Sequence, residues 1–288
     1  MLVIGAAAAV VVAASLAFTR GGGGGKSSAN TQTKAQKAQR QDAKEKAEKR
    51  RKEAAARVQR KLEAKADLAA ARYAEIGLPL YCGGTRKNVV ALTFDDGPSQ
   101  YTESDLLPVL GARHARATFF ILGRHISNYP NAILKEVKHG ALGDHTWNHS
   151  SLPGLNRFAL KAELGDTQRE LQRAIGKPIR LFRPPYGAHD ATVDEQIKAY
   201  GMLQVLWSID SHDWKGLSAT AMINRVLASV KPGSIVLMHD IHSNTMEALP
   251  TLVRALHHRG FRLVTIPEML VLAPPTMRQL SLGAAGCE

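Results

Sequence analysis

Two adjacent aspartates, Asp95 and Asp96, stand where an apolar stretch of the chain gives way to a turn. The preceding residues 89–92 are typical of a buried strand, and Gly97-Pro98 supplies the turn. Side chains alternate across a strand, so both carboxylates reach one site only if the backbone turns there. Two carboxylates at one site repel each other unless a positive charge lies beside them. The pair therefore indicates a metal site, with one aspartate as ligand and the other free for proton transfer.

A second motif supplies the nitrogen ligands that such a site needs. His145 and His149 are four residues apart, which places two imidazoles on one face of a helical turn. With Asp96 they complete a set of two histidines and one carboxylate that leaves positions open for water and substrate. The chain has eleven histidines, so the alternative is a chance spacing of surface or capping residues.

Arg183 is the candidate for keeping one aspartate ionised. It follows the apolar residues 179–182, from where its guanidinium can hold Asp95 in its charged form through a bidentate pair. The alternative is an ordinary ion pair at the end of a strand.

His239 is the candidate for a general acid. It ends the apolar stretch 234–238, and a histidine with a carboxylate partner is typical of that role. Asp213 and Asp240 are both available as the partner, and the sequence does not separate them. Trp214, beside this acidic cluster, is the candidate for a wall on which a sugar ring stacks, and a place in the core is the alternative.

These clusters share one position relative to the predicted strands. From about residue 78, apolar runs alternate with amphipathic stretches, which predicts a parallel sheet or a closed (β/α) barrel. Each polar cluster follows an apolar run, and the carboxyl ends of barrel strands form the catalytic face. The apolar runs cover residues 89–94, 117–122, 141–143, 179–182, 202–209, 234–238 and 261–264.

Five short motifs, in order along the chain, resemble those of the polysaccharide deacetylases of carbohydrate esterase family 4, the NodB-homology domain. The resemblance covers about residues 85–270. The motifs are Thr93-Phe94-Asp95-Asp96-Gly97, His145-Thr146-Trp147-Asn148-His149, Arg183-Pro184-Pro185-Tyr186-Gly187, Asp210-Ser211-His212-Asp213-Trp214 and Leu237-Met238-His239-Asp240. One departure is Asp144, where the family more often has Asn before the first histidine. An extra carboxylate there could tune the metal affinity or the acidity of the site.

The resemblance implies an α/β fold, a deformed (β/α) barrel, and a hydrolase that removes acetyl groups from polymers containing N-acetylglucosamine. It also implies that Asp96, His145 and His149 bind a divalent metal ion, commonly zinc, with cobalt or other ions as alternatives. Asp95 would then act as the base.

The resemblance also implies that His239 is the acid and that the backbone N–H at Tyr186 stabilises the oxyanion. In the mechanism that we expect, Asp213 orients His239, which protonates the leaving nitrogen, and Arg183 keeps Asp95 ionised. Leu237 would help to line a pocket for the acetyl methyl group.

Peptidoglycan is the expected substrate. Chitin, chitooligosaccharides and a non-sugar amide are alternatives within the same fold. A catalytically silent carbohydrate-binding module is the alternative from another class, and the presence of base, acid and all three ligands argues against it. We expect a monomer.

The N-terminal residues 1–19 are expected to be a signal peptide or a membrane anchor, because residues 2–18 carry no charge. Basic residues follow this run and none precedes it, so the positive-inside rule alone would keep the rest of the chain cytoplasmic. Peptidoglycan lies outside the membrane, which favours export. We therefore expect the protein at the extracellular face, either anchored or secreted.

Residues 20–77 are expected to form a Gly-rich hinge and a basic, Ala-rich linker, helical or disordered, before a catalytic domain at 78–288. The linker holds 16 Lys and Arg against 7 Asp and Glu, whereas the domain holds 22 against 18. This distribution argues against nucleic-acid binding and for a spacer that associates with a membrane or cell wall. The second half of the tract 34–76 has an apolar stripe that could dock, but too few heptad positions for a coiled coil.

Only two cysteines, Cys82 and Cys287, occur, and they bracket the predicted domain. Domain termini often lie close together, so a disulfide in an oxidising compartment is one interpretation. Two unrelated free thiols are the other, and the sequence leaves both open.

Overall fold

The computed structural model describes residues 28–288, with side chains from residue 36 onward. The expected signal peptide or anchor at 1–19 lies outside the described residues. Two units are distinguished, one ending at Arg57 and one spanning Val58–Glu288. In the first, residues 28–57 are helical and the side chains of residues 36–57 are exposed. None of the described helices combines the length and the apolarity that crossing a bilayer requires.

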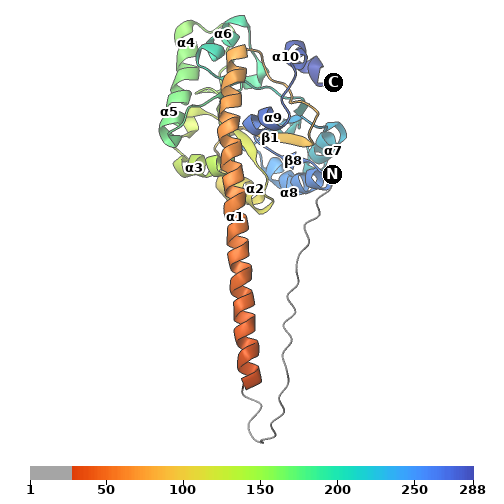
Figure 1. The fold of residues 1–288 in the computed structure, drawn as a ribbon. Helices are drawn as coiled ribbons and strands as arrows, with labels where there is room; N and C mark the ends of the chain where they lie inside the picture. The colour runs from red at the N-terminus through yellow and green to blue at the C-terminus, as the bar shows by residue number, and fades with distance from the viewer. Residues whose placement is uncertain (1–27) are drawn as a thin grey trace, which may run out of the picture. The chain divides into compact units, whose positions relative to one another are not determined.

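The second unit is built on a curled sheet of parallel strands (Figure 1). The order is β5-β4-β3-β2-β1-β7-β6, and β8 pairs with the start of β1. Within the described residues β5 and β6, at the two ends, do not pair with each other, so the barrel is open. The predicted deformed (β/α) barrel is therefore confirmed. The strands are β1 Val89–Gly97, β2 Ala117–Ile121, β3 Gly140–Asp144, β4 Leu181–Phe182, β5 Leu203–Gln204, β6 Ile209–Asp210, β7 Ile235–His239 and β8 Arg262–Leu263.

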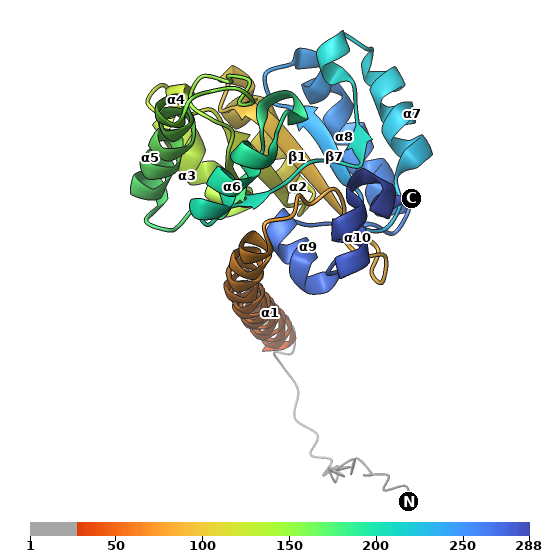
Figure 2. The same ribbon diagram turned by 90° about the horizontal axis from the view of Figure 1, so that it is seen from above.

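Helices follow most strands and cover the outer face of the sheet. Figure 2 shows β1 and β7 in the middle of the domain, with α3 to α6 on one side and α7 and α8 on the other. The helices are α2 Leu107–Ala112, α3 Pro130–His139, α4 Arg157–Lys161, α5 Thr167–Ile175, α6 Ala191–Ala199, α7 Ala219–Ser229, α8 Ser243–His258, α9 Ile266–Leu272 and α10 Met277–Leu282. Several begin at side-chain caps, such as Asp190 before α6 and the Thr265–Glu268 capping box of α9.

Two layers of apolar side chains hold this sheet in place. Leu92 and Phe94 of β1 pack outward against the helices, whereas Val89 and Ala91 point into the barrel interior. Met269 of α9 packs into that interior cluster. Because both faces of β1 are buried, the strand is apolar before the two aspartates at its end, with Thr93 as the one exception.

The second half of α1 (Ser28–Ile76) docks on this barrel. Ala66, Ala70 and Ala74, spaced four residues apart, are each at most 2% exposed. Small side chains on one helical face let the helix backbone approach the barrel closely. The compact unit therefore begins at Val58, about 20 residues before the domain start at 78 that the sequence suggests.

Arg116 fastens α1 to the barrel through two carboxylates. Its Nη2 lies 2.8 Å from Glu63 of α1, and its Nε lies 2.9 Å from Glu268 of α9. Gln59 donates a further hydrogen bond to Glu268. Glu268 is almost fully buried, so this pair is screened little by solvent.

Cys82 and Cys287 form a disulfide that joins residues 205 positions apart. It ties the segment before β1 to the C-terminal turn after α10, and so closes the barrel from Cys82 to Cys287 into one covalent loop. Of the two interpretations that the sequence leaves open, the structure contains the disulfide.

Reducing this disulfide should lower the free energy of unfolding by about 2–5 kcal/mol, because a long loop in the unfolded chain is released. Urea unfolding with and without reductant measures the change. The double variant Cys82→Ser/Cys287→Ser is the control and should not respond to reductant. An unfolding midpoint that reduction leaves unchanged would contradict the expectation.

Candidate metal centre and catalytic site

The polar clusters meet at the carboxyl ends of the strands. In the sheet register, Asp95 of β1 pairs with His239 of β7, and Asp144 of β3 pairs with Phe182 of β4. The residues after β3 and β4, His145 and Arg183, reach Asp95 at the end of β1 with their side chains. Parallel pairing thus brings together side chains that are far apart in sequence.

Three side chains form a set that can hold a metal ion. The Nε2 atoms of His145 and His149 lie 3.5 Å and 3.4 Å from Oδ1 of Asp96, and all three ligand atoms are within 4.8 Å of one another. Bonds of roughly 2.0–2.2 Å in tetrahedral geometry put ligand atoms roughly 3.3–3.5 Å apart. Oδ1 of Asp96 is buried and has no hydrogen-bond partner among the described residues. The three residues therefore fit a divalent metal ion.

Hydrogen bonds orient both histidine rings, and for His145 the bond also sets the tautomer. Nδ1 of His145 lies 2.7 Å from the carbonyl oxygen of Arg183, which can only accept, so Nδ1 carries the proton and Nε2 is left free. Burial lowers the pKa of His145 to about 3, although the charge of Asp96 opposes this. His149 places Nδ1 3.2 Å from the hydroxyl of Tyr186, and its Nε2 faces Oδ1 of Asp96.

The backbone of the site differs from the sequence expectation at two places. The turn that brings both aspartates to one site begins at Asp96, with φ of +72° and a register shift between Asp95 and Gly97, and not at Gly97-Pro98. Residues 145–149 form a loop and not a helical turn, because Thr146 and His149 have left-handed backbone angles.

Glu163 holds this loop, and sequence reasoning missed it. Its carboxylate accepts hydrogen bonds from the backbone N–H groups of Trp147 and Asn148 at 2.9 Å and 2.8 Å, and from the Ser150 hydroxyl at 2.6 Å. His125, also missed, places Nδ1 3.0 Å from the carbonyl oxygen of Asp96. Neither belongs to a motif at a strand end, so no local pattern marks them.

Asp95 and Arg183 form a fully buried ion pair. Nη1 of Arg183 lies 2.7 Å from Oδ1 of Asp95 and also donates to Thr93. The pair is not bidentate, because Nη2 and Nε instead donate to the carbonyl oxygens of Leu206 and Val205. Burial raises the pKa of Asp95, and the charge of Arg183 acts in the opposite direction. The other oxygen, Oδ2, lies 3.7 Å from Nε2 of His145, beside the metal set.

Asp213, and not Asp240, is the partner of His239. Nδ1 of His239 lies 2.8 Å from Oδ1 of Asp213, whose Oδ2 accepts from the His239 backbone N–H and from Thr245. Burial by itself would lower the pKa of His239, but the hydrogen bond and charge of Asp213 raise it to about 9, with smaller contributions from Asp95 and Asp96. The protonated imidazole therefore keeps Nε2–H free to donate.

Two further buried carboxyls lie behind the site. Asp240 accepts a hydrogen bond from Thr102 at 2.6 Å, and burial raises its pKa to about 7. Asp144 accepts the backbone N–H of Thr146 at 2.7 Å, and burial raises its pKa well above the ordinary value. The carboxyl that departs from the family pattern thus supports the loop of the two histidines.

Of the three residues expected to contact substrate, two are exposed and one is buried. Tyr186 and Trp214 are 71% and 51% exposed, so their rings are open to a ligand. The indole N–H of Trp214 donates to Asp210 at 3.3 Å. Leu237 is buried in β7, opposite Thr93 of β1.

Removing any of the three ligands should abolish tight metal binding. We expect His145→Ala and Asp96→Ala to weaken Zn²⁺ binding by more than about 100-fold. Removing a residue that only hydrogen-bonds to a metal ligand already lowers metal affinity by about 10–100-fold, so removing the ligand itself should lower it further. Competition with a chromogenic chelator measures the affinity. The matched control is His258→Ala, an exposed histidine of α8. Unchanged affinity in the ligand variants would rule out this site.

In metal-free protein, His239 should titrate near pH 9, and Asp213→Asn should bring its pKa below the ordinary 6.5, because burial then acts without the charged partner. The folded pKa is raised, so this interaction stabilises the protein fully below pH 6.5 and is lost as the pH rises through about 9. NMR titration of the imidazole measures both values. An unchanged pKa in the variant would contradict the assignment.

Comparisons with known proteins agree with this geometry. A family model described as polysaccharide deacetylase matches residues 83–205. The peptidoglycan-N-acetylglucosamine deacetylase PgdA of Listeria monocytogenes is 36% identical over 181 residues, which cover 62% of this chain and 38% of that protein. The chitooligosaccharide deacetylase of Rhizobium leguminosarum bv. trifolii is 31% identical over 206 residues, which cover 66% of this chain and 96% of that protein.

Solved structures extend the likeness to the fold. The crystal structure of a CE4 family pseudoenzyme from Bacillus anthracis has a TM-score of 0.63 at 29% identity, over 67% of this chain and 68% of that one. The chain spans about two-fifths of the length of the Listeria protein but nearly all of the Rhizobium protein. Motifs, fold and relatives agree: the chain belongs to the polysaccharide deacetylase family, carbohydrate esterase family 4.

Proposed function

We propose that this protein hydrolyses the N-acetyl groups of N-acetylglucosamine residues in peptidoglycan, outside the cell membrane and with a divalent metal ion, zinc first among the candidates. The observation that carries the proposal is the pairing of Asp95 with His239 in the sheet register, beside the three ligands. A base and an acid thus flank one metal set. The Listeria relative, a peptidoglycan-N-acetylglucosamine deacetylase by name, supports the substrate.

Amide hydrolysis needs three things from the protein: a base for the attacking water, donors for the oxyanion and an acid for the leaving nitrogen. Asp95 offers Oδ2 toward the site while Arg183 holds Oδ1, so one oxygen is fixed and the other can accept a proton. The chemistry supplied by a divalent cation at Asp96, His145 and His149 is polarisation of the carbonyl and acidification of water.

His239 completes the proton transfer. Asp213 holds its Nδ1–H, so the Nε2–H of the charged ring is available to protonate the glucosamine nitrogen as the C–N bond breaks. The backbone N–H at Tyr186 would donate to the oxyanion, and the exposed ring of Trp214 offers a stacking surface for a sugar. The released products are acetate and a free amine on the polymer.

The disulfide supports export, because disulfides persist in oxidising compartments outside the cytosol. The first unit supports association with an anionic cell surface. Its exposed residues 36–57 carry nine Lys and Arg and four Asp and Glu. No membrane-spanning helix is among the described residues, so anchoring rests on the sequence of residues 1–19 alone.

The test is acetate release from purified peptidoglycan and from chitotetraose by the full chain with Zn²⁺ or Co²⁺. Asp95→Asn should lower turnover by at least about 100-fold while the metal stays bound, because the base is lost and no ligand is touched. Asp166→Asn, on an exposed part of the domain, is the matched control.

The outcomes separate the alternatives. Near-normal turnover in Asp95→Asn would make the assignment of the base wrong. Acetate from chitotetraose alone would favour the chitooligosaccharide activity that the Rhizobium relative's name describes. No acetate from either substrate, with metal bound, would favour a silent carbohydrate-binding module or another amide.

A further inference from the structure

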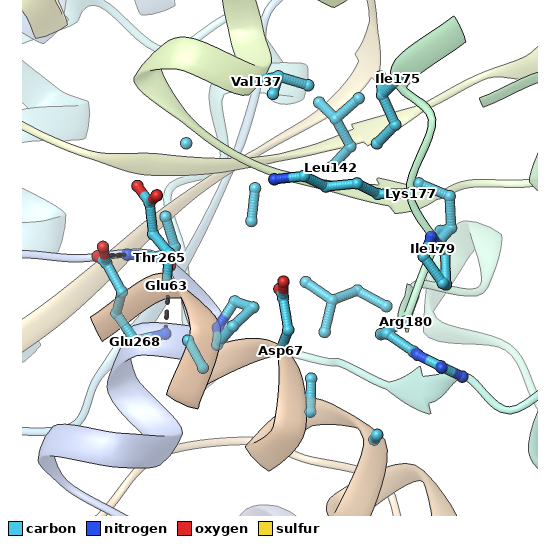
Figure 3. Close-up of a pocket in the computed structure, with 18 of the residues that line it drawn as sticks. Glu63, Asp67, Val137, Leu142, Ile175, Lys177, Ile179, Arg180, Thr265 and Glu268 are labelled. Carbon is cyan, nitrogen blue, oxygen red and sulfur yellow. Dashed lines mark hydrogen bonds between the residues drawn. The ribbon is translucent and has the colours of Figure 1, made fainter. Parts of the chain in front are cut away.

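A groove of about 390 Å³ lies at the end of the barrel opposite the metal set, between the second half of α1 and the starts of β3 and β4 (Figure 3). Its α1 wall includes Glu63, Asp67 and Ala70, which precede the segment 83–205 that the family model matches. The α1 wall of the groove therefore lies outside the segment that the family model matches. Its volume is within the range of small-ligand sites.

The sheet has an open seam along this groove. β2 pairs with β3 from Gly140 to Asp144, but β4 pairs with β3 at Asp144 only. The carbonyl of Asp144 accepts from Arg183, so the backbone groups of Leu142, two residues earlier, point to the same side. No strand in the described part of the chain pairs with Leu142 on that side. β3 is an interior strand and Leu142 is 7% exposed, so only the side of this residue that lines the groove is open to pairing with an extended peptide.

The two walls of the groove carry opposite charge. In Figure 3, Asp67 rises into the groove from α1, while Lys177 extends across it from the facing wall. Within the described residues neither side chain has an ion pair or a side-chain hydrogen bond, although the charge of Lys177 reaches Asp67 and lowers its pKa against the larger, opposite effect of burial. Arg180 adds a second positive charge at the Lys177 wall.

The remaining lining restricts what can bind. On the α1 side, Glu63 and Glu268 share Arg116, so that wall keeps an excess of negative charge. Apolar side chains line the groove between the two charged walls, namely those of Val137, Leu142, Ile175 and Ile179. Asp67 and Lys177 are exposed, so a purely apolar ligand would gain nothing from either charge, and a polyanion would meet the carboxylates. A ligand with a cation at one end and an anion at the other satisfies both walls.

We propose that the groove binds a short peptide with a free ammonium group and a free carboxylate. The ammonium group faces Asp67, the carboxylate faces Lys177, and the peptide backbone pairs with Leu142. The source is the short peptide that the glycan strands of peptidoglycan carry. This choice of source rests on the proposed function, whereas the peptide chemistry rests on the groove.

Such a site would hold the polymer by its peptide while the sugar occupies the metal face. It would thereby favour peptide-bearing peptidoglycan over chitin, which has no peptide. Removal of either wall charge should therefore raise KM for peptidoglycan and leave deacetylation of chitotetraose unchanged.

Calorimetric titration of the full chain tests the proposal with four probes: a disaccharide tetrapeptide from peptidoglycan, its tetrapeptide alone, the same tetrapeptide with both termini and side-chain charges blocked, and chitotetraose. Wild type should bind the first two and not the blocked peptide. Asp67→Asn and Lys177→Ala should each weaken binding by about tenfold or more. Glu75→Gln, an exposed residue of α1, and Lys138→Ala, an exposed residue of α3, are the matched controls and should bind as wild type.

The test is independent of catalysis. His145→Ala should lose acetate release and keep peptide binding. If no acetate is released from any substrate but the tetrapeptide binds through Asp67 and Lys177, the proposed function fails and the peptide site stands. No binding of the tetrapeptide at millimolar concentration, or equal binding by wild type and both wall variants, would overturn the peptide site.

Discussion

The site depends on one fully buried guanidinium, that of Arg183. It bonds Thr93 and Asp95 at the end of β1 and the carbonyl oxygens of Val205 and Leu206, so three segments of the barrel share one charge. Its own carbonyl holds the ring of His145. Loss of either partner of a buried ion pair leaves an uncompensated charge and costs about 3–5 kcal/mol. The base, one metal ligand and the local fold are therefore coupled through Arg183.

More carboxylates than cationic side chains lie around Arg183. Asp95, Asp96, Asp213 and Asp240 lie close enough to affect one another or His239. Burial disfavours the ionised forms of Asp95, Asp213 and Asp240, and Arg183 and His239 oppose that effect for Asp95 and Asp213. Asp96, with a buried oxygen that has no partner among the described residues, is the carboxylate left for a metal ion.

Much of this arrangement could be predicted from the residues at the strand ends. The alternation of apolar runs and helices predicted the barrel, and the paired aspartates with two histidines predicted a metal set, because parallel strands bring their carboxyl ends together. The local backbone could not be predicted in the same way. The His145–His149 spacing suggested a helical turn, but the loop is held by Glu163, which lies 14 residues beyond His149 and has no motif of its own.

The sequence by itself determined which chemical groups stand at the end of each strand, since strand order and side-chain alternation follow from apolar patterning. Only the tertiary structure decided which of these groups touch. In the folded protein His239 bonds Asp213 instead of Asp240, and Arg183 donates a single hydrogen bond to Asp95. The disulfide is formed, and α1 lies against the open seam of the sheet. The physical reason is that hydrogen bonds and pKa values depend on distance and burial in the folded chain. Neither quantity is encoded in the spacing of residues along it.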